Sequence, residues 1–315
     1  MRKQVHVVSH GPHCLDGVTA AVAVARYHQG QADVVPHFAA NNEIDAVLRT
    51  VAAEPGRDTE LWITDISWKE PATDGHLRAL AAAGVRIYWI DHHRTALERV
   101  RAGRVQVPFA DSVVSEEFAA SRLTYEYLAR RLAAEGRRAP AFDALACVVV
   151  MADDNDRWLH RVPGSRELAW VVRSLGADAY GELLALDERV TYSPRMQAAR
   201  ARVEAEIAHS FAVADASRTE RRVGGVTLVA AMCDGHPSEV ADAWGKTIPN
   251  AVFALYDAES LSVSFRRSPD CTVDLSRLAA GLGGGGHAAA SGCELPGLRR
   301  GLAEALAEQV ARALA

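Results

Sequence analysis

Short apolar runs alternate with Ala-rich amphipathic stretches along the first half of the chain. Runs such as Val85–Ile90 have the length and composition of buried strands, and stretches such as Asp16–Gln29 have the spacing of helices. The expected strands are Val5–Ser9, Val34–Phe38, Leu61–Thr64, Val85–Ile90 and Val105–Phe109. The expected helices are Asp16–Gln29, Glu43–Ala53 and Pro71–Ala83. This alternation predicts an α/β fold with a mostly parallel sheet flanked by helices.

The pattern changes twice in the second half. Residues 115–186 are typical of helices throughout, and Pro194–Ala214 predicts one longer helix rich in Ala, Glu and Arg. Strands are expected again at Val226–Met232, Val252–Tyr256 and Leu261–Phe265, and helices at Pro237–Trp244, Leu275–Leu282 and from Leu298. We therefore expect a first domain over residues 1–190, a helical linker over 191–217 and a smaller C-terminal α/β domain over 218–315.

Composition narrows the class of protein. The 315 residues carry a net charge of −5, which argues against a protein that coats long nucleic acid. Five scattered cysteines without a CxxC pair indicate neither a disulfide framework nor a zinc knuckle. The first residues enter a strand at once, without the apolar core of a signal peptide, and no run approaches the length of a membrane span. We expect a cytoplasmic protein with no membrane contact.

Acidic and imidazole side chains follow the predicted strands. Asp91-His92-His93 comes directly after Ile90, Asp65 comes after Thr64, and His10 to Asp16 follow the first strand. A fourth group, Asp153 to Asp156, follows an apolar run. Each group alone is explained by a turn or a helix cap. Because parallel strands end at one edge of a sheet, however, these groups should meet there. Grouped carboxylates repel one another, and a bound cation usually neutralises their charge. Carboxylates with imidazoles suit Mn²⁺, or Mg²⁺, Fe²⁺ or Zn²⁺.

These residues carry a resemblance to a known family. His10, Asp16-Gly17, Asp65, Asp91-His92-His93 and Asp154 resemble the four motifs of the DHH phosphoesterase superfamily. The stretch Gly283–Gly292 resembles the glycine-rich signature of the DHH-associated C-terminal domain, and Val263–Arg266 resembles the strand before it. The resemblance spans nearly the whole chain.

The resemblance implies a site with two divalent ions, most often Mn²⁺, with Zn²⁺, Fe²⁺, Co²⁺ or Mg²⁺ as alternatives. By position, His10 and Asp65 would hold one ion. Asp16, Asp65, His92 and Asp154 would hold the other, so that Asp65 bridges the two.

Two further roles follow from the same resemblance. Asp91 would orient the neighbouring imidazoles, and His93 would face the substrate phosphate. Asp153 and Asp156 flank Asp154, and any of the three could be the ligand; the spacing to the following tryptophan favours Asp154.

Cys14 departs from the family pattern, because an Asp usually stands at its position. Cys14 could bind as a thiolate and favour a softer ion such as Zn²⁺ or Fe²⁺. Alternatively, His13 could replace the missing ligand, or the first ion could bind weakly. The simplest alternative is that Cys14 only fills the turn and the first ion site is degenerate.

The late glycines are a candidate substrate site. Gly284, Gly285 and Gly286 let backbone N–H groups approach an anion, His287 adds a donor, and Arg266 precedes them on a predicted strand. A flexible linker is the structural alternative.

The leading prediction is a metal-dependent phosphoesterase for short nucleotides: oligoribonucleotides, linear dinucleotides or 3′-phosphoadenosine-5′-phosphate. An exopolyphosphatase or pyrophosphatase is the second hypothesis, and a nucleotide-binding protein without turnover is the third, because Cys14 replaces a ligand. The family resemblance also allows a homodimer.

Overall fold

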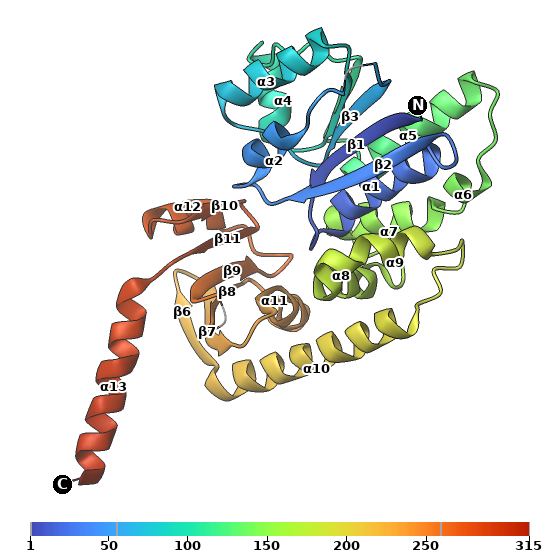
Figure 1. Ribbon diagram of the computed structural model, residues 1–315. Coiled ribbons are helices and arrows are strands. Elements are labelled where there is room, and N and C mark those ends of the chain that lie inside the picture. The colour runs from blue at the N-terminus through green and yellow to red at the C-terminus, as the bar shows by residue number, and fades with distance from the viewer. Residues whose placement is uncertain (1, 55, 259, 315) are drawn as a thin grey trace. The chain divides into compact units, whose positions relative to one another are not determined.

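The computed structural model describes residues 2–54, 56–258 and 260–314. The chain forms two compact units, residues 1–201 and 202–315. The division falls inside one long helix, α10 (Pro194–Ser217), close to where the sequence predicts a helical connector. Within the described residues, no helix is both long and apolar enough to cross a membrane. Figure 1 follows the chain from β1 at the N-terminus to α13 at the C-terminus.

Five strands form a wholly parallel sheet in the first unit, in the spatial order β2-β1-β3-β4-β5. The strands are β1 (Lys3–His10), β2 (Ala32–Ala39), β3 (Thr59–Thr64), β4 (Arg86–Asp91) and β5 (Asp111–Val114). All of β3 is buried, and so are most residues of β1 and β4, as in a sheet covered on both faces. The predicted α/β class is confirmed.

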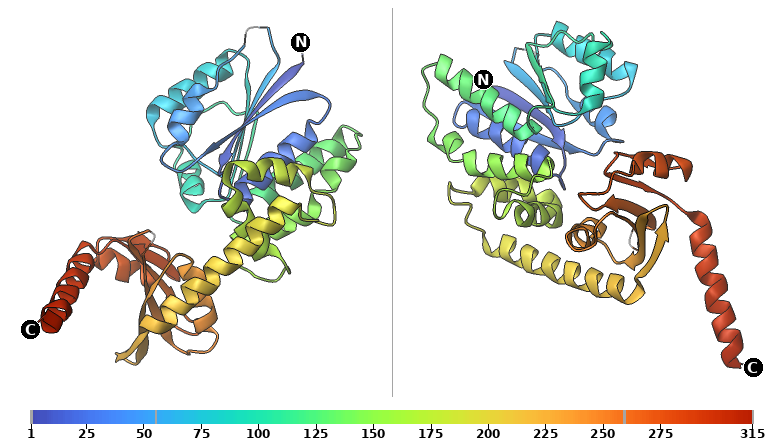
Figure 2. Two further views of the ribbon diagram at one scale, coloured as in Figure 1. Left: turned by 60° about the horizontal axis from the view of Figure 1, so that its bottom comes forward. Right: turned by 180° about the vertical axis from the view of Figure 1, so that it is seen from behind.

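Helices cover both faces of this sheet, as the left view of Figure 2 shows. Alternate residues of β3 point into two different cores: Trp62 belongs to the core that includes residues of α1, α5 and α7, and Ile63 belongs to the core that includes residues of α2, α3 and α4. The helices are α1 (Leu15–Tyr27), α2 (Ile44–Thr50), α3 (Pro71–Ala82), α4 (Arg94–Arg101), α5 (Ala120–Ala134), α6 (Pro140–Asp143), α7 (Ala146–Asp156), α8 (Ser165–Leu175) and α9 (Ala179–Ala185). A 3₁₀ turn, Gly176–Asp178, joins α8 to α9. Every residue of α1 is buried, which explains its small Ala and Val side chains.

One predicted strand was wrong. Val105–Phe109 is a loop, and the fifth strand lies a few residues later, at Asp111–Val114. Pro108 has no N–H to contribute to a ladder. The N–H of Phe109 turns back to the carbonyl of Val107 at 3.0 Å, and pairing with β4 begins only after Ala110 donates to Ile87.

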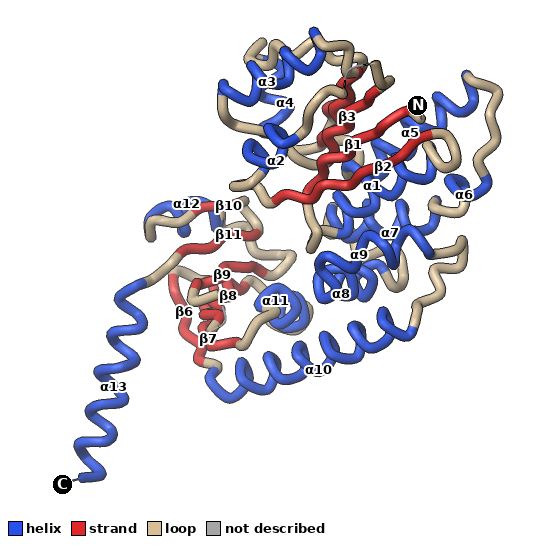
Figure 3. The backbone as a smooth tube through the Cα atoms, in the orientation of Figure 1, coloured by secondary structure: helices blue, strands red, loops and turns tan. Residues whose placement is uncertain are grey.

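The second unit contains a six-stranded mixed sheet in the order β10-β11-β9-β8-β7-β6. Figure 3 shows its strands in red, with α11 beside them. The elements are β6 (Thr219–Val223), β7 (Val226–Cys233), α11 (Pro237–Gly245), β8 (Ala251–Asp257), β9 (Ser262–Arg267), α12 (Leu275–Gly281), β10 (Gly285–Gly286), β11 (Ala290–Cys293) and α13 (Pro296–Leu314). Only β7 and β8 pair in parallel. The smaller C-terminal α/β unit is therefore also as predicted.

Candidate metal centre

Three adjacent strands of the parallel sheet carry acidic and imidazole groups to one edge. His10 ends β1, Asp65 follows β3, and Asp91 ends β4. These strands are neighbours, with Ser9 opposite Thr64 and Thr64 opposite Ile90. The chain leaves β1 towards β2 on one side, while β3 lies on the other side. The cluster thus stands at a topological switch point, where open α/β sheets usually bind ligands.

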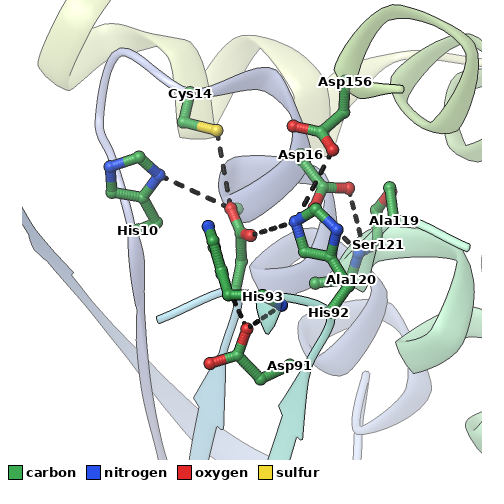
Figure 4. A network of polar contacts seen from close by, with 12 residues as sticks. His10, Cys14, Asp16, Asp91, His92, His93, Ala119, Ala120, Ser121 and Asp156 are labelled. Atoms are coloured by element: carbon green, nitrogen blue, oxygen red, sulfur yellow. Dashed lines mark hydrogen bonds and ion pairs between the residues drawn. The ribbon is translucent and has the colours of Figure 1, made fainter. Parts of the chain in front are cut away.

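Asp65 lies at the centre of the cluster, and its two oxygens face different partners (Figure 4). Oδ2 is 3.6 Å from His10 Nδ1 and accepts from the thiol of Cys14 at 3.5 Å. Oδ1 is 3.3 Å from His92 Nε2. The Asp65 side chain is 2% exposed, so these groups are its surroundings rather than water. A carboxylate placed in this way can bridge two cations.

The backbone around Asp65 is unusual. Asp65 has a φ of +60°, a conformation that costs energy for a residue with a Cβ, and its N–H donates to Ile90 at 3.0 Å. Gly17 lies against it: an added Cβ would be 2.1 Å from the carbonyl oxygen of His10 and 3.0 Å from Asp65 Oδ2. The absence of a side chain at Gly17 lets the start of α1 approach the strand ends. Asp16 reaches the cluster for that reason.

Asp16 is held by the N-terminus of α5. Its Oδ2 accepts from the N–H of Ala120 at 2.8 Å, and its Oδ1 accepts from the N–H of Ser121 at 2.9 Å. The same Oδ2 is 3.8 Å from His92 Nε2. The first turn of a helix favours a negative charge, so α5 positions this carboxylate.

The structure brings Asp156, not Asp154, to this cluster. Asp156 Oδ2 is 3.5 Å from His92 Nε2. Asp154 accepts instead from the N–H of Arg161 at 2.7 Å and the hydroxyl of Ser165 at 2.6 Å. All of Ala146–Asp156 is helical, and two residues along a helix turn a side chain by about 200°. Asp154 and Asp156 therefore point in nearly opposite directions, which corrects the placement expected from the spacing to Trp158.

Asp91 is a completely buried anchor for His93. Its Oδ1 accepts from both the N–H and the Nδ1 of His93, at 3.0 and 2.7 Å. Its Oδ2 accepts from the hydroxyl of Ser67 at 2.5 Å. These bonds leave Nε2 of His93, whose side chain is 43% exposed, as the nitrogen available to a ligand. Asp91 therefore fixes the orientation of the His93 ring.

The pKa values of the cluster show why it suits a cation. Burial, and then the charges of Asp65 and Asp156, raise the pKa of Asp16 well above its usual range. Although burial opposes it, hydrogen bonding to Asp65 raises the pKa of His92 to about 9. Although burial also opposes ionisation of Asp65, hydrogen bonds from His10 and His92 hold the pKa of that carboxyl well below its usual range. The crowded carboxylates thus favour bound protons, which a divalent cation can replace.

Cys14 faces the same cluster. Two groups of side chains each bring three potential metal-ligating atoms to within 4.8 Å of one another. The first is His10, Cys14 and Asp65, and the second is Asp16, His92 and Asp156. Burial, followed by the charge of Asp65, raises the pKa of the Cys14 thiol well above its ordinary value. Without a cation the sulfur therefore stays protonated. The neighbouring His13 is occupied elsewhere, with its Nδ1 2.9 Å from the carbonyl of Arg173.

The late glycines form a tight β-hairpin in the second unit. Gly285 and Gly286 make up β10 and pair with Gly292 and Ser291 of β11. The strands approach so closely that a Cβ on Gly284 would be 2.1 Å from the carbonyl oxygen of Gly292. The linker alternative is therefore wrong, and close backbone packing accounts for part of this glycine content.

The two side chains expected to bind substrate differ in their surroundings. His287 is exposed at the tip of this hairpin, where its N–H donates to Ala290 at 2.7 Å. Arg266 on β9 is half-buried, donates to Ser238 at 2.9 Å, and has its pKa lowered by burial. Arg266 also lies beside β11, opposite Ala290. The second unit thus brings Arg266 and the hairpin together.

Sequence comparison gives one curated relative. Over 309 residues, 92% of this chain and 72% of the relative, the chain is 28% identical to oligoribonuclease NrnB of Bacillus subtilis (strain 168). No family model matches. The aligned region covers 92% of the chain and so extends through both units.

The similarity to this oligoribonuclease agrees with the resemblance of the sequence motifs to the DHH phosphoesterase superfamily. Two solved structures share the fold of this chain. A pGpG-specific phosphodiesterase, PggH of Vibrio cholerae, superposes with a TM-score of 0.57 at 13% identity, over 99% of each chain. An exonuclease RecJ bound to manganese superposes with a TM-score of 0.51 at 15% identity, over 93% of this chain and 86% of the other.

Proposed function

We propose that this protein is a metal-dependent phosphoesterase that hydrolyses short nucleotides with the help of two divalent cations. The observation that carries the proposal is the position of Asp65, whose two oxygens face two separate groups of potential ligands. One oxygen faces His10 and Cys14, and the other faces His92, whose Nε2 is also near Asp16 and Asp156. A single cation would not require this division.

The proposed ligands follow from these contacts. His10, Cys14 and Asp65 would hold one ion. Asp16, Asp65, His92 and Asp156 would hold the other, with Asp156 in the place first expected for Asp154. Imidazoles and carboxylates suit Mn²⁺, and the RecJ structure with a similar fold was solved with manganese. The thiol of Cys14 would favour Zn²⁺, Fe²⁺ or Co²⁺ at the first position.

The chemistry needs few groups beyond these. Two bound cations activate water at neutral pH and offset negative charge on the phosphoryl oxygens. His93 is held by Asp91 through Nδ1, and its Nε2 is proposed to donate to a phosphate oxygen. This bond to Asp91 raises the pKa of His93. The charged, donating form of the imidazole is therefore favoured.

The proposed substrates are oligoribonucleotides, linear dinucleotides or 3′-phosphoadenosine-5′-phosphate. Support comes from the relatives, which are named an oligoribonuclease and a pGpG-specific phosphodiesterase. Arg266, Gly284, Gly285, Gly286 and His287 are proposed to hold part of the nucleotide. The guanidinium and imidazole supply donors for an anion, whereas the glycines bring backbone N–H groups close to it.

The test measures bound metal and hydrolysis in the same preparation. Chelator-treated protein is reloaded with Mn²⁺, Co²⁺, Zn²⁺, Fe²⁺ or Mg²⁺, and metal per chain is determined by elemental analysis. Each form is assayed on a linear dinucleotide, 3′-phosphoadenosine-5′-phosphate, a cyclic dinucleotide and polyphosphate. We expect close to two ions per chain and hydrolysis of a linear dinucleotide or the bisphosphate.

Asp65→Asn is the informative variant, because it removes the shared carboxylate. Asp33→Asn is the control in the same unit: this carboxylate on β2 pairs with Arg57 at 2.7 Å and lies outside the cluster. Phosphate release from polyphosphate alone would exclude the nucleotide proposal. Nucleotide binding without hydrolysis under every metal would favour the non-catalytic alternative.

A further inference from the structure

A hollow of about 610 Å³ lies beside the metal centre, at the same edge of the parallel sheet. Its walls come from the segments that follow β2, β3 and β4. The volume lies within the range of roughly 300–1,000 Å³ that is usual for small-molecule sites. The lining residues are Asn41, Ser67, Trp68, Lys69, Pro71, Asp74, His93, Thr95, Arg99 and Arg104. All of them belong to the first unit, so this hollow is complete without the second.

The hollow and the metal centre share a wall. His93 lines the hollow, and one of its ring nitrogens also lies within 4.8 Å of potential metal-ligating atoms of Asp65 and His92. Ser67 lines the hollow and donates to Asp91, the carboxylate that fixes His93. A ligand that fills the hollow would therefore contact His93, at the wall shared with the metal centre.

The lining is rich in positive charge. Lys69, Arg99 and Arg104 face a single carboxylate, Asp74, which already accepts from Trp68. Within the described chain, neither Lys69 nor Arg104 has an ion-pair partner. The other two lysines of the sequence do: Lys3 pairs with Glu60 at 2.5 Å, and Lys246 pairs with Asp242 at 3.0 Å. The lining thus holds an excess of cations that the protein itself does not neutralise.

Arg99 is held in place at the back of this hollow. Its Nη1 donates to the backbone carbonyl of Trp68, and its guanidinium lies 5.1 Å from the centre of the Trp68 ring. Trp68 itself is fully buried, so it is a rigid support. A guanidinium has five N–H donors, and this arrangement uses one of them in a hydrogen bond. The others suit the oxygens of a phosphate.

A second hollow of the first unit, of about 540 Å³, offers a contrast. Its only charged lining residue is Arg26. That guanidinium donates to backbone carbonyls, at 2.9 Å to Ala141 and 3.2 Å to Leu184, and also to Leu186. Its N–H donors are therefore already used in hydrogen bonds to the backbone. Of these two hollows, the one beside the metal centre is therefore better suited to an anion.

We propose that the hollow beside the metal centre binds a second phosphate of the substrate, next to the phosphate held by the cations. The inference rests on the proposed function and narrows its substrate class to short nucleotides that carry two phosphate groups. The terminal 5′-phosphate of a linear dinucleotide and the second phosphate of a nucleoside 3′,5′-bisphosphate share this chemistry. Lys69 and Arg104 contribute charge, and Arg99 contributes oriented donors.

The kinetic test compares substrates that differ only in the second phosphate. These are the dinucleotide pApA against ApA, and adenosine 3′,5′-bisphosphate against adenosine 3′-monophosphate. The variant is Lys69→Ala/Arg104→Ala, and the control is Arg101→Ala/Lys246→Ala, which removes the same charge from exposed positions outside the hollow. In the variant, the ratio of kcat/KM with and without the second phosphate should fall at least about tenfold, which corresponds to about 1.4 kcal/mol. In the control the ratio should stay within about twofold, as is usual for surface substitutions.

A fall in this ratio for the dinucleotide pair would indicate that the hollow binds a 5′-phosphate of a dinucleotide, and a fall for the adenosine pair would indicate that it binds the 5′-phosphate of a nucleoside bisphosphate. An equal loss of kcat/KM on both members of each pair, or no loss on either, would overturn the proposal.

A binding measurement separates this proposal from the proposed function. Adenosine 5′-monophosphate is titrated calorimetrically into chelator-treated protein, in which the carboxylates of the metal centre repel phosphate. Binding that weakens at least about tenfold in Lys69→Ala/Arg104→Ala but not in the control supports the subsite even if no phosphoester is hydrolysed. Equal binding by all three proteins overturns it, even if hydrolysis is observed.

Discussion

Replacing Asp156 by Asn removes one negative charge from the metal centre while keeping the size of the side chain. Asp156 lies 3.5 Å from His92 and its side chain is 27% exposed. Burial raises its pKa, opposed by His92 and assisted by the charge of Asp65. In cation-free protein the substitution loses one attraction and relieves one repulsion. The free energy of unfolding should change by no more than about 1 kcal/mol, as for partly exposed ion pairs.

Cation binding should respond much more strongly to Asp156→Asn. Even groups that only orient a metal ligand contribute about 10–100-fold to affinity. Loss of a carboxylate that contacts the ion should therefore weaken Mn²⁺ binding at least about tenfold, or about 1.4 kcal/mol.

Asp154→Asn should have the opposite pair of effects. The Asp154 residue is 2% exposed, and each of its oxygens accepts one hydrogen bond, from Arg161 and from Ser165. An amide keeps one acceptor and loses the charge in both bonds. Since a hydrogen bond to a charged group contributes about 1.5–3 kcal/mol, we expect a loss of at least about 1.5 kcal/mol in stability. For a unit of this size that lowers the Tm by roughly 3 °C or more. Mn²⁺ affinity should be unchanged.

Thermal unfolding followed by circular dichroism, with and without Mn²⁺, measures both effects on chelator-treated protein. At a Mn²⁺ concentration about 100 times the Kd, binding should stabilise the unsubstituted protein by about 2.7 kcal/mol. Asp154→Asn should start from a lower Tm and gain the same increment. Asp156→Asn should start near the original Tm and gain a smaller one. Weaker Mn²⁺ binding by Asp154→Asn, with normal binding by Asp156→Asn, would refute the proposed ligand set.

Three other outcomes are expected. Cys14→Asp should keep or raise Mn²⁺-dependent hydrolysis, because a carboxylate suits Mn²⁺ better than a thiol whose pKa is raised by burial; a large drop in initial rate would show that sulfur is required. Gly17→Ala should lower both Tm and Mn²⁺ affinity, because its Cβ would lie 2.1 Å from the His10 carbonyl oxygen, and an unchanged titration would contradict this packing. With a pKa of about 9 in cation-free protein, His92 contributes stability that is complete below about pH 6.5 and is lost as the pH rises through 9. Mn²⁺ affinity measured by calorimetry should rise over that same interval, with proton release, and a flat profile would argue against His92 as a ligand.

Much of the first unit follows from local pattern. Apolar runs of strand length separated by helical stretches are enough to indicate a parallel sheet, and acidic or imidazole residues directly after those runs must emerge at one edge. His10, Asp65 and His92 were placed together by that reasoning. The same reasoning wrongly predicted a strand at Val105–Phe109. The composition of this loop is that of a strand, but Pro108 lacks the N–H that a ladder needs.

The amino-acid sequence by itself determined the α/β class, the edge of the sheet that carries the chemistry, and most of the residues gathered there. Only the tertiary structure decided which carboxylate of the Asp153–Asp156 group reaches His92, because that depends on the rotation of α7 about its axis as it packs against α1 and α5. Only the tertiary structure, likewise, brought Lys69, Arg99 and Arg104 around one hollow. Lys69 follows β3, whereas Arg99 lies on α4 and Arg104 follows that helix, and no periodicity along the chain relates the three. Their nearness is a consequence of how β3 and β4 align in the sheet.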